Sequence, residues 1–346
     1  MSSTSLRRCF LILAGAALVL IAGLATAETI VTVPVGNVPN AADTTGCGAV
    51  SYPYSIGKYE VTAGQYTEFL NAVAATDTYG LYNTGMDDVT SWYSGCGIVR
   101  NGNSGSYTYS LLAAEWANRP VNFVSWGDAA RFANWLHNGK PTGPQGDLTT
   151  ERGSYNLNGA ITSDALFLVN RTGVETWVIP TRDEWYKAAY YDPQKGGPGS
   201  PGYWNYPMKS DSPTVPSNDL TVPPTSDPGN NANFRVGFDF SVGYPYFRSE
   251  FGAFANSESA YNTFDQGGNV REWTEDRGGT TWYRYTRGGD WDTDSSYLQS
   301  GTAWGYSPIQ EYQMVGFRVA LVPEPGSIVL LFGAAAAGCV AWRRRK

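Results

Sequence analysis

The chain has 346 residues, a formal net charge of −7 and a pI near 4.9. Nucleic-acid binding needs a basic patch, so this acidic balance predicts no nucleic-acid partner. The only histidine is His137, and one histidine excludes a zinc or iron centre of the usual multi-histidine type. Glycine, tyrosine and tryptophan number 40, 23 and 12, while charged residues make up only 16% of the chain. This composition favours a loop-rich, aromatic-packed exported domain over a helical cytoplasmic one.

Residues 1–27 have the three parts of a secretory signal peptide. Arg7 lies in a basic start, an apolar run follows as far as Ala25, and small residues complete an A-x-A site that ends at Ala27. We therefore expect cleavage before Glu28. The alternative is an uncleaved membrane anchor, which the short, glycine-interrupted apolar run disfavours, since a membrane span needs ~20 residues.

The mature chain starts with an extended lead-in over residues 28–50, followed by a predicted strand at 51–61. Three capping boxes then predict helices that begin at Thr62 with Gln65, at Ser125 with Asp128, and at Thr181 with Glu184. Residues 77–117 show no helical pattern before 111–116. Further strands are predicted at 177–180, 267–273, 285–291 and 315–320.

Residues 193–231 are rich in proline, glycine, serine and asparagine, and we interpret them as a long surface excursion within one domain. Residues 51–322 therefore form a single α+β domain with short helices and much irregular structure. Five tryptophans in this range are expected in the core, because aromatic side chains bury large areas: Trp126, Trp135, Trp185, Trp273 and Trp291. We expect Arg182 and Arg318 to form buried or bridging ion pairs.

Two of the four cysteines lie in the mature domain. Cys9 belongs to the signal peptide and Cys339 to the C-terminal segment, which leaves Cys47 and Cys96. In an oxidising compartment such a lone pair either forms a disulfide or stays as two thiols. The sequence leaves both open, because it does not show how closely the two backbones approach.

Six segments follow one another in an order that resembles a known family. They read KYEVTAGQYTEFLNA, RPVNFVSWGDAARFANWL, IPTRDEWYKAA, GGNVREWTED, TRGGDWD and VGFRVA. They resemble the signature blocks of the formylglycine-generating enzyme, or sulfatase-modifying factor, family, and the resemblance covers about residues 52–322. It implies a compact variant of the C-type-lectin-like architecture with little regular secondary structure.

The resemblance also identifies a departure at the family's oxidative site. Family members that make formylglycine hold copper between two cysteines five positions apart, just after an Arg-Gly-Gly-Ser-Trp-like block. Thr293 and Leu298 stand at those positions, and neither supplies a thiolate for Cu(I). Asp290 replaces the serine of the block. Another branch of the family uses an iron centre built from histidines, which one histidine excludes. We therefore expect no copper, iron or zinc, and Asp290, Trp291 and Thr293 remain as candidates for lining a pocket.

A structural calcium ion is also implied by the resemblance. The implied ligands are the side chains of Asp265 and Glu272 and the carbonyls of Gly268 and Val270. Oxygen ligands with paired carboxylates suit this hard ion, although the same acids also suit a surface turn. A second calcium site is implied at Asn233 and Phe234, although its acidic partner does not align cleanly.

The final segment, residues 323–346, combines a Pro-Glu-Pro motif, an apolar stretch at 327–342 and a basic cluster at 343–346. It resembles the PEP-CTERM sorting signal, which an exosortase-type protease removes during export to the surface or extracellular matrix. A hydrophobic segment before positive charge is held in the membrane, so we expect transient anchoring there. The alternative is an ordinary tail anchor that stays in place.

These features lead to one main functional hypothesis and two alternatives. The main one is a non-catalytic binding or structural module of the envelope or extracellular matrix, with a surface polysaccharide or an envelope protein as its partner. The first alternative is an enzyme of unknown chemistry, or a formylglycine-generating oxidase, that uses the family pocket. The second is carbohydrate binding by fold analogy alone. Tyrosines and tryptophans at 77–117 and 282–312 are the candidates for an exposed recognition surface.

Overall fold

The computed structural model describes residues 29–90, 94–173, 176–212, 214–221, 225–279 and 282–323. The predicted signal peptide and the apolar tail stretch lie outside these residues. Within them, no helix is long and apolar enough to span a bilayer.

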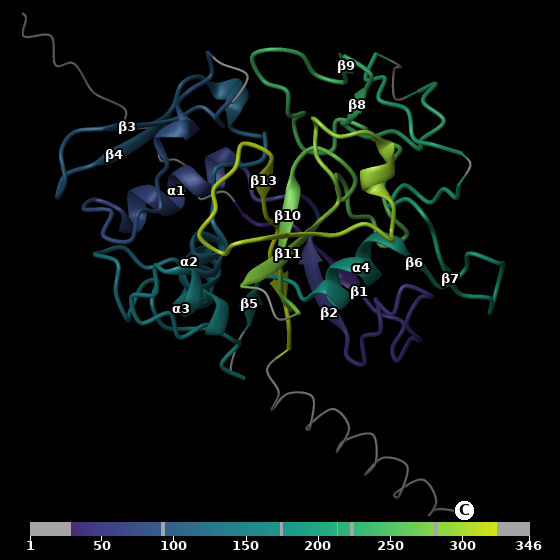
Figure 1. The fold of residues 1–346 in the computed structure, drawn as a ribbon, viewed down its shortest axis with the longest axis horizontal. Helices are drawn as coiled ribbons and strands as arrows, with labels where there is room; N and C mark the ends of the chain where they lie inside the picture. Colours follow the sequence, from purple (N-terminus) through teal and green to yellow (C-terminus); the bar gives the residue numbers. More distant parts are fainter. Residues whose placement is uncertain are drawn as a thin grey trace, which may run out of the picture.

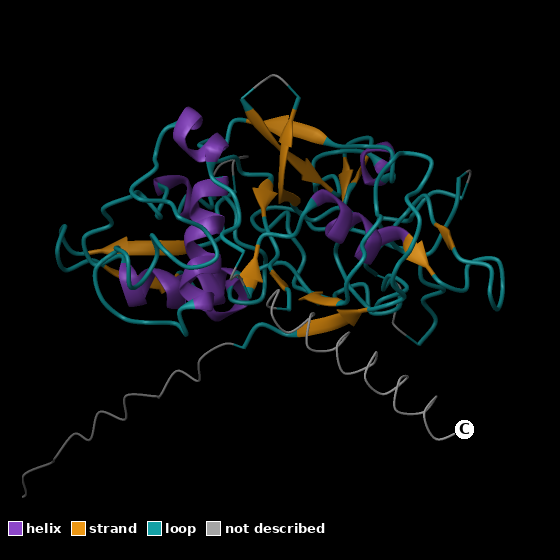
Figure 2. Cartoon of the chain, turned by 90° about the horizontal axis from the view of Figure 1, so that it is seen from below, coloured by secondary structure: helices purple, strands orange, loops and turns teal. Residues whose placement is uncertain are grey.

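Four α-helices and fourteen short strands are found in the described residues (Figure 1). The helices are α1 Ala63–Val73, α2 Trp126–His137, α3 Ser163–Leu168 and α4 Arg182–Tyr190. The strands are β1 Thr32–Val35, β2 Tyr54–Gly57, β3 Ile98–Asn101, β4 Thr108–Leu111, β5 Trp177–Val178, β6 Tyr191–Asp192, β7 Gly202–Tyr203, β8 Arg235–Val236, β9 Asp239–Phe240, β10 Arg271–Gly278, β11 Tyr283–Arg287, β12 Trp304–Tyr306, β13 Val315–Gly316 and β14 Ala320–Leu321. Figure 2 shows how much of the chain between them is loop, which confirms the predicted α+β class with little regular secondary structure.

Two four-stranded sheets form the centre of the fold. Their strand orders are β1-β2-β14-β5 and β12-β11-β10-β13. The chain passes between the sheets at 317–319, where Phe317, Arg318 and Val319 are buried and the carbonyls of Phe317 and Val319 accept from Val61 and Gly57. The single strand predicted at 315–320 is therefore two short strands, because each end pairs with a different sheet.

All three predicted capping boxes are confirmed. In α1, α2 and α4 the cap hydroxyl accepts from the third backbone N–H of the helix, and the third side chain accepts from the N-cap backbone. The short helix α3 has no capping box, and its N-terminus is capped by the Thr162 hydroxyl alone. The helix predicted at 111–116 is a 3₁₀ turn at Ala114–Trp116, because residues up to Leu111 pair in β4.

The lead-in at 28–50 is part of the domain. Its β1 pairs antiparallel with β2, with Thr32 opposite Gly57 and Val35 opposite Tyr54. The domain boundary predicted at residue 51 is therefore too late, because the lead-in supplies the edge strand of a central sheet. The strand predicted at 51–61 is confined to β2.

Aromatic rings from separate elements form the main core between α1, α2 and the central sheets. Phe132 of α2 lies 5.3 Å from Phe69 of α1 and 5.4 Å from Phe317, measured between ring centroids. All five tryptophans predicted in the core are buried, with at most 2% of their surface exposed. Large aromatic area thus compensates for the small share of regular secondary structure.

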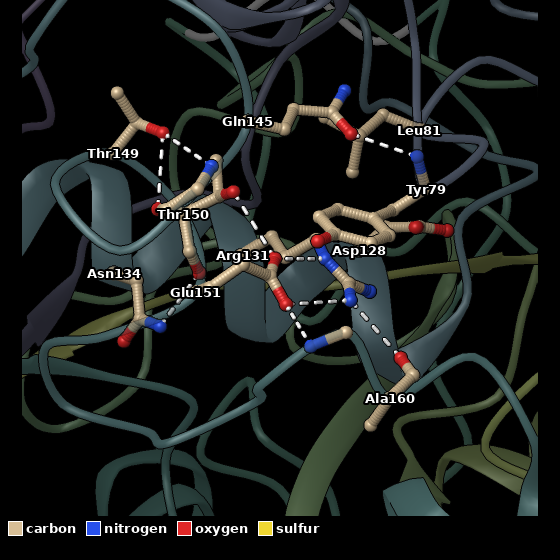
Figure 3. Close-up of polar contacts among 12 residues, drawn as sticks. Tyr79, Leu81, Asp128, Arg131, Asn134, Gln145, Thr149, Thr150, Glu151 and Ala160 are labelled. Atoms are coloured by element: carbon tan, nitrogen blue, oxygen red, sulfur yellow. Dashed lines mark hydrogen bonds and ion pairs between the residues drawn. The ribbon is translucent and has the colours of Figure 1, made fainter.

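A buried ion pair fixes the loop at 144–160 against α2 (Figure 3). The Arg131 Nε lies 2.7 Å from Oε1 of Glu151, and its Nη2 donates to Oε2 of the same carboxylate and to the Ala160 carbonyl. The Tyr79 ring lies 4.5 Å from the guanidinium. Both charged side chains are 2% exposed and well hydrogen-bonded, so this network stabilises the fold.

Candidate functional site

Asp290 stands in the family block where a serine is usual, and it is fully buried. Its carboxylate forms an ion pair with Arg271 and accepts from the Asp292 backbone N–H at 2.9 Å. Burial raises the pKa of Asp290, and the Arg271 charge opposes that shift. The Thr293 hydroxyl accepts from the Asp290 N–H and donates to the Asp290 carbonyl, both at 3.0 Å. The two residues therefore close a turn.

Leu298 and Trp291 are packed in the interior at the same place. Leu298 is fully buried in a small cluster with Tyr206, Met208, Ala232 and Phe234. The Trp291 ring is 2% exposed and stacks on Phe247 with centroids 4.7 Å apart. In the structure Asp290, Trp291 and Thr293 lie together as packed or hydrogen-bonded groups, and a pocket lined by them stays a prediction.

Next to this turn, four aromatic side chains form a surface that we call the aromatic platform: Tyr297, Trp304, Tyr306 and Tyr312. The rings of Tyr297 and Trp304 stack with centroids 5.7 Å apart and an interplanar angle of 12°. Tyr306 and Tyr312 meet edge to face at 5.1 Å. Trp304 is 44% exposed on the edge strand β12. The platform is therefore ordered by ring contacts. Trp304 is its exposed ring, whereas Tyr297, Tyr306 and Tyr312 are partly buried.

Arg271 connects the platform to the buried turn. Its Nη1 donates to the Tyr306 hydroxyl at 3.0 Å, and its guanidinium lies 5.2 Å from the Trp304 ring and 5.5 Å from the Tyr297 ring. Its Nε side is held by Asp290. Asp290 therefore orients Arg271 and balances its charge, and the guanidinium lies close to both stacked rings.

Buried polar atoms on the same face of the sheet have no hydrogen-bond partner within the described residues. These are Thr286 Oγ1 and Arg284 Nε of β11, and Nε1 of Trp126, in the helix α2, is likewise without a partner. Strand register places Thr286 opposite Trp304 and Arg284 opposite Tyr306, and the Arg284 guanidinium lies 3.4 Å from the Trp126 ring. Because buried polar groups normally find partners, these atoms favour a polar guest or water beneath the platform.

Gly305 makes the close packing at β12 possible. The Tyr283 ring lies across this position, and a Cβ added at Gly305 would be 2.1 Å from Tyr283 Cδ2. Only glycine fits, so the Trp-Gly-Tyr sequence of β12 allows two large rings on one face of the strand and a close ring contact on the other.

Comparison with known proteins establishes the family. The model of the sulfatase-modifying factor enzyme 1-like domain matches residues 22–322. The chain belongs to this family. The model of the PEP-CTERM protein-sorting motif matches residues 321–346. No curated protein matches the chain.

Several solved structures are similar to this member of the sulfatase-modifying factor family. CarF shares 20% identity at a TM-score of 0.47, over 85% of this chain and 99% of its own. Treponema denticola variable protein 1 shares 19% identity at a TM-score of 0.47, over 84% of this chain and 95% of its own. PvdO from Pseudomonas aeruginosa shares 17% identity at a TM-score of 0.44, over 84% of this chain and 92% of its own.

The calcium site implied by the sulfatase-modifying factor family fits the structure poorly at Glu272. Both oxygens of this fully buried carboxylate are engaged by Arg318, and Trp185 Nε1 donates to Oε2 at 2.7 Å. Arg318 donates in addition to the carbonyls of Gly57 and Phe264. The Arg318 guanidinium therefore already balances the charge of Glu272, in the place of the implied calcium ion. The expected ion pair of Arg318 is confirmed, whereas the Arg182 guanidinium lies over the Tyr285 ring.

Asp265 is the better candidate ligand of that set. One of its oxygens accepts from the Gly252 N–H at 2.8 Å, and burial raises its pKa to about 6. Sequence analysis missed Glu60, whose oxygens accept from Asn269 and from the N–H of Val270. Burial, and then the charges of Asp265 and Glu272, raise the pKa of Glu60 well above its usual range. Gly268 donates its N–H to Gly288. Calcium binding stays a prediction.

The second implied calcium site also stays a prediction. Asn233 donates its amide to the Phe247 carbonyl at 2.9 Å and to Asn269 at 3.0 Å, and its Oδ1 has no partner in the described part of the chain. The Phe234 carbonyl accepts from Asn218. Among the described residues, no three His, Cys, Asp or Glu side chains are grouped to hold a metal.

Cys47 and Cys96 do not form a disulfide in this structure, so the pairing considered from sequence is not made. Both are free and buried. Cys47 packs beside α4 with its Sγ 3.5 Å from Arg287 Nη2, whereas Cys96 lies in the main core with α1. The two thiols belong to separate clusters, which explains why no bond joins them.

Proposed function

We propose that this exported domain is a non-catalytic member of the sulfatase-modifying factor family that serves as a binding or structural module of the envelope or extracellular matrix. The observation that supports it is the occupancy of the family's copper position. Thr293 is a turn-forming hydroxyl and Leu298 a core side chain, so neither provides a soft ligand there. The scaffold around them is retained and well packed.

The sorting motif indicates export and association with the envelope, and implies processing by an exosortase-type protease. We further propose removal of the signal peptide before Glu28 and of the tail after the domain. Just after β14, the Val322 N–H donates to the Thr176 carbonyl at 2.8 Å, next to the motif. Loss of the tail therefore removes no strand of the central sheets.

The export proposal is tested with a C-terminally tagged chain in cells with and without exosortase. We expect the tag and residues 343–346 to be lost only where the protease is present. Persistence of the tag in both strains means that the segment is a plain tail anchor.

The non-catalytic proposal is tested by giving the purified full chain copper, oxygen and a Cys-x-Pro-x-Arg peptide. We expect the peptide thiol to remain and no aldehyde to form. The alternative, an enzyme that uses the old pocket, requires a reactive Asp290. Turnover of any metabolite that is abolished by Asp290→Asn would support that enzyme, although Arg271 already engages this carboxylate.

A further inference from the structure

We propose that the aromatic platform binds a neutral polysaccharide, with sugar rings stacked on Trp304 and its neighbours. This inference rests on the proposed function, because it names the ligand class of a binding module. It concerns four rings from the 3₁₀ turn at Ser295–Leu298, from β12 and from the following loop.

The shape and exposure of the rings suit a flat ligand with C–H groups on its faces. The faces of pyranose rings carry axial C–H groups, which are attracted to the negative face of an aromatic ring. Trp304 is 44% exposed, and the ring of Tyr297 lies within 12° of parallel to it. Tyr297 covers one face of Trp304, and the half-exposed Trp304 offers its other face to a sugar ring. Because the pair is already ordered, binding costs little side-chain entropy.

The charges around the platform favour a neutral ligand. Asp290 neutralises Arg271, which is the cation nearest to the rings. On the same turn Asp294 is exposed, and Asp292 is paired with Arg235 at 3.3 Å. The chain as a whole carries −7. The acidic groups of this turn would repel an anionic polysaccharide, because the nearby Arg271 is already paired with Asp290.

The unpartnered atoms beneath the rings favour a hydroxylated ligand over an apolar protein surface. Thr286 Oγ1 and Arg284 Nε lie on the sheet face that carries Trp304 and Tyr306. Because these atoms are buried, a ligand reaches them only through water beneath the rings, and sugar hydroxyls can hydrogen-bond that water whereas an apolar partner cannot.

The experiment is affinity electrophoresis of the full chain in gels that contain soluble neutral polysaccharides, namely mannan, xylan and a β-glucan, with alginate as the charged control. We compare the wild type with Trp304→Ala and with a matched control, Trp282→Ala. Trp282 is 52% exposed but contacts Phe167, away from the platform. Thermal unfolding of each variant checks that the fold is retained.

We expect retardation in at least one neutral gel, a loss of affinity of about tenfold or more for Trp304→Ala, and unchanged affinity for Trp282→Ala. Three results would overturn the inference: no retardation in any neutral gel, stronger retardation by alginate, or equal losses in both variants. If the electrophoresis fails and the peptide assay shows no oxidation, only the sugar ligand is excluded. If the peptide is oxidised, the proposed non-catalytic function is itself excluded.

Discussion

Arg271 and Glu272 are neighbours on β10, yet their two ion pairs serve different parts of the molecule. Glu272 pairs with Arg318, both fully buried, and Arg318 reaches the Gly57 carbonyl at the end of β2. Arg271 pairs with Asp290 and contacts the half-exposed ring of Trp304. Because successive side chains of a strand point to opposite faces, one pair joins the two central sheets and the other supports the platform.

The comparison implies that scaffold and binding surface respond separately to substitution. The largest expected effect is on the scaffold side. Glu272→Gln leaves the Arg318 charge buried without its carboxylate, and we expect the free energy of unfolding to fall by about 3–5 kcal/mol. Urea denaturation measures it. A loss below about 1 kcal/mol would show that this pair does not hold the sheets together.

Asp290→Asn should cost less. Arg271 keeps its hydrogen bond to Tyr306 and its ring contacts, so we expect a loss of about 1.5–3 kcal/mol, the contribution of a hydrogen bond to a charged group. The platform should also loosen, which tryptophan fluorescence detects as a red shift. An unchanged spectrum would mean that Asp290 does not position the rings through Arg271.

The pH dependence of stability provides a further test on the platform side, through Glu311. Glu311 lies next to Tyr312, and its pKa is raised from 4.5 to about 8, first by burial and then by the charge of Asp128, with Asp77 adding to it. The folded state therefore holds a proton that the unfolded state has released between these two values. Stability should fall as pH rises through this window, by at most about 1.4 kcal/mol per pH unit for this group.

Glu311→Gln removes that titration. The new side-chain amide can still accept a hydrogen bond from Asn83, which contacts the Glu311 carboxyl in the wild type. We expect the variant to lose less stability than the wild type between pH 5 and pH 8, as measured by urea midpoints. Asp128 and Asp265, with pKa values raised to about 6, still titrate in both proteins. Identical slopes would exclude Glu311 as the source.

The smallest expected effect is that of Trp304→Ala on stability. Since the side chain is 44% exposed at a sheet edge, the loss should stay below about 1 kcal/mol, within the range of surface substitutions. Calorimetry compares it with Trp273→Ala, a fully buried neighbour in the sheet, for which about 3–5 kcal/mol is expected. Similar losses for both would place Trp304 in the core.

Local signals made much of the fold predictable. The capping boxes at Thr62, Ser125 and Thr181 fixed three helix starts, because each needs only residues three apart. Arg318 was expected in a buried ion pair and forms one. By contrast, the sequence does not mark β1 as a strand, since the role of a four-residue strand becomes visible only when β2 lies beside it.

The candidate site was less predictable, for a physical reason. Tyr297, Trp304 and Arg271 come from three segments, and sequence alone indicated only that aromatic residues at 282–312 lie outside helices. Which ring is exposed depends on the tertiary packing that places Asp290 behind Arg271. Glu60 was missed likewise, because nothing local marks a glutamate that meets Asn269 across the domain.

The most direct test of the central claim is a Cu(I) titration of the purified full chain against a competing chelator. We expect the chelator to take all of the copper, because Thr293 and Leu298 offer no thiolate and the domain's two cysteines are buried in separate clusters. One tightly held copper ion per chain would contradict it and restore an oxidase as the leading interpretation.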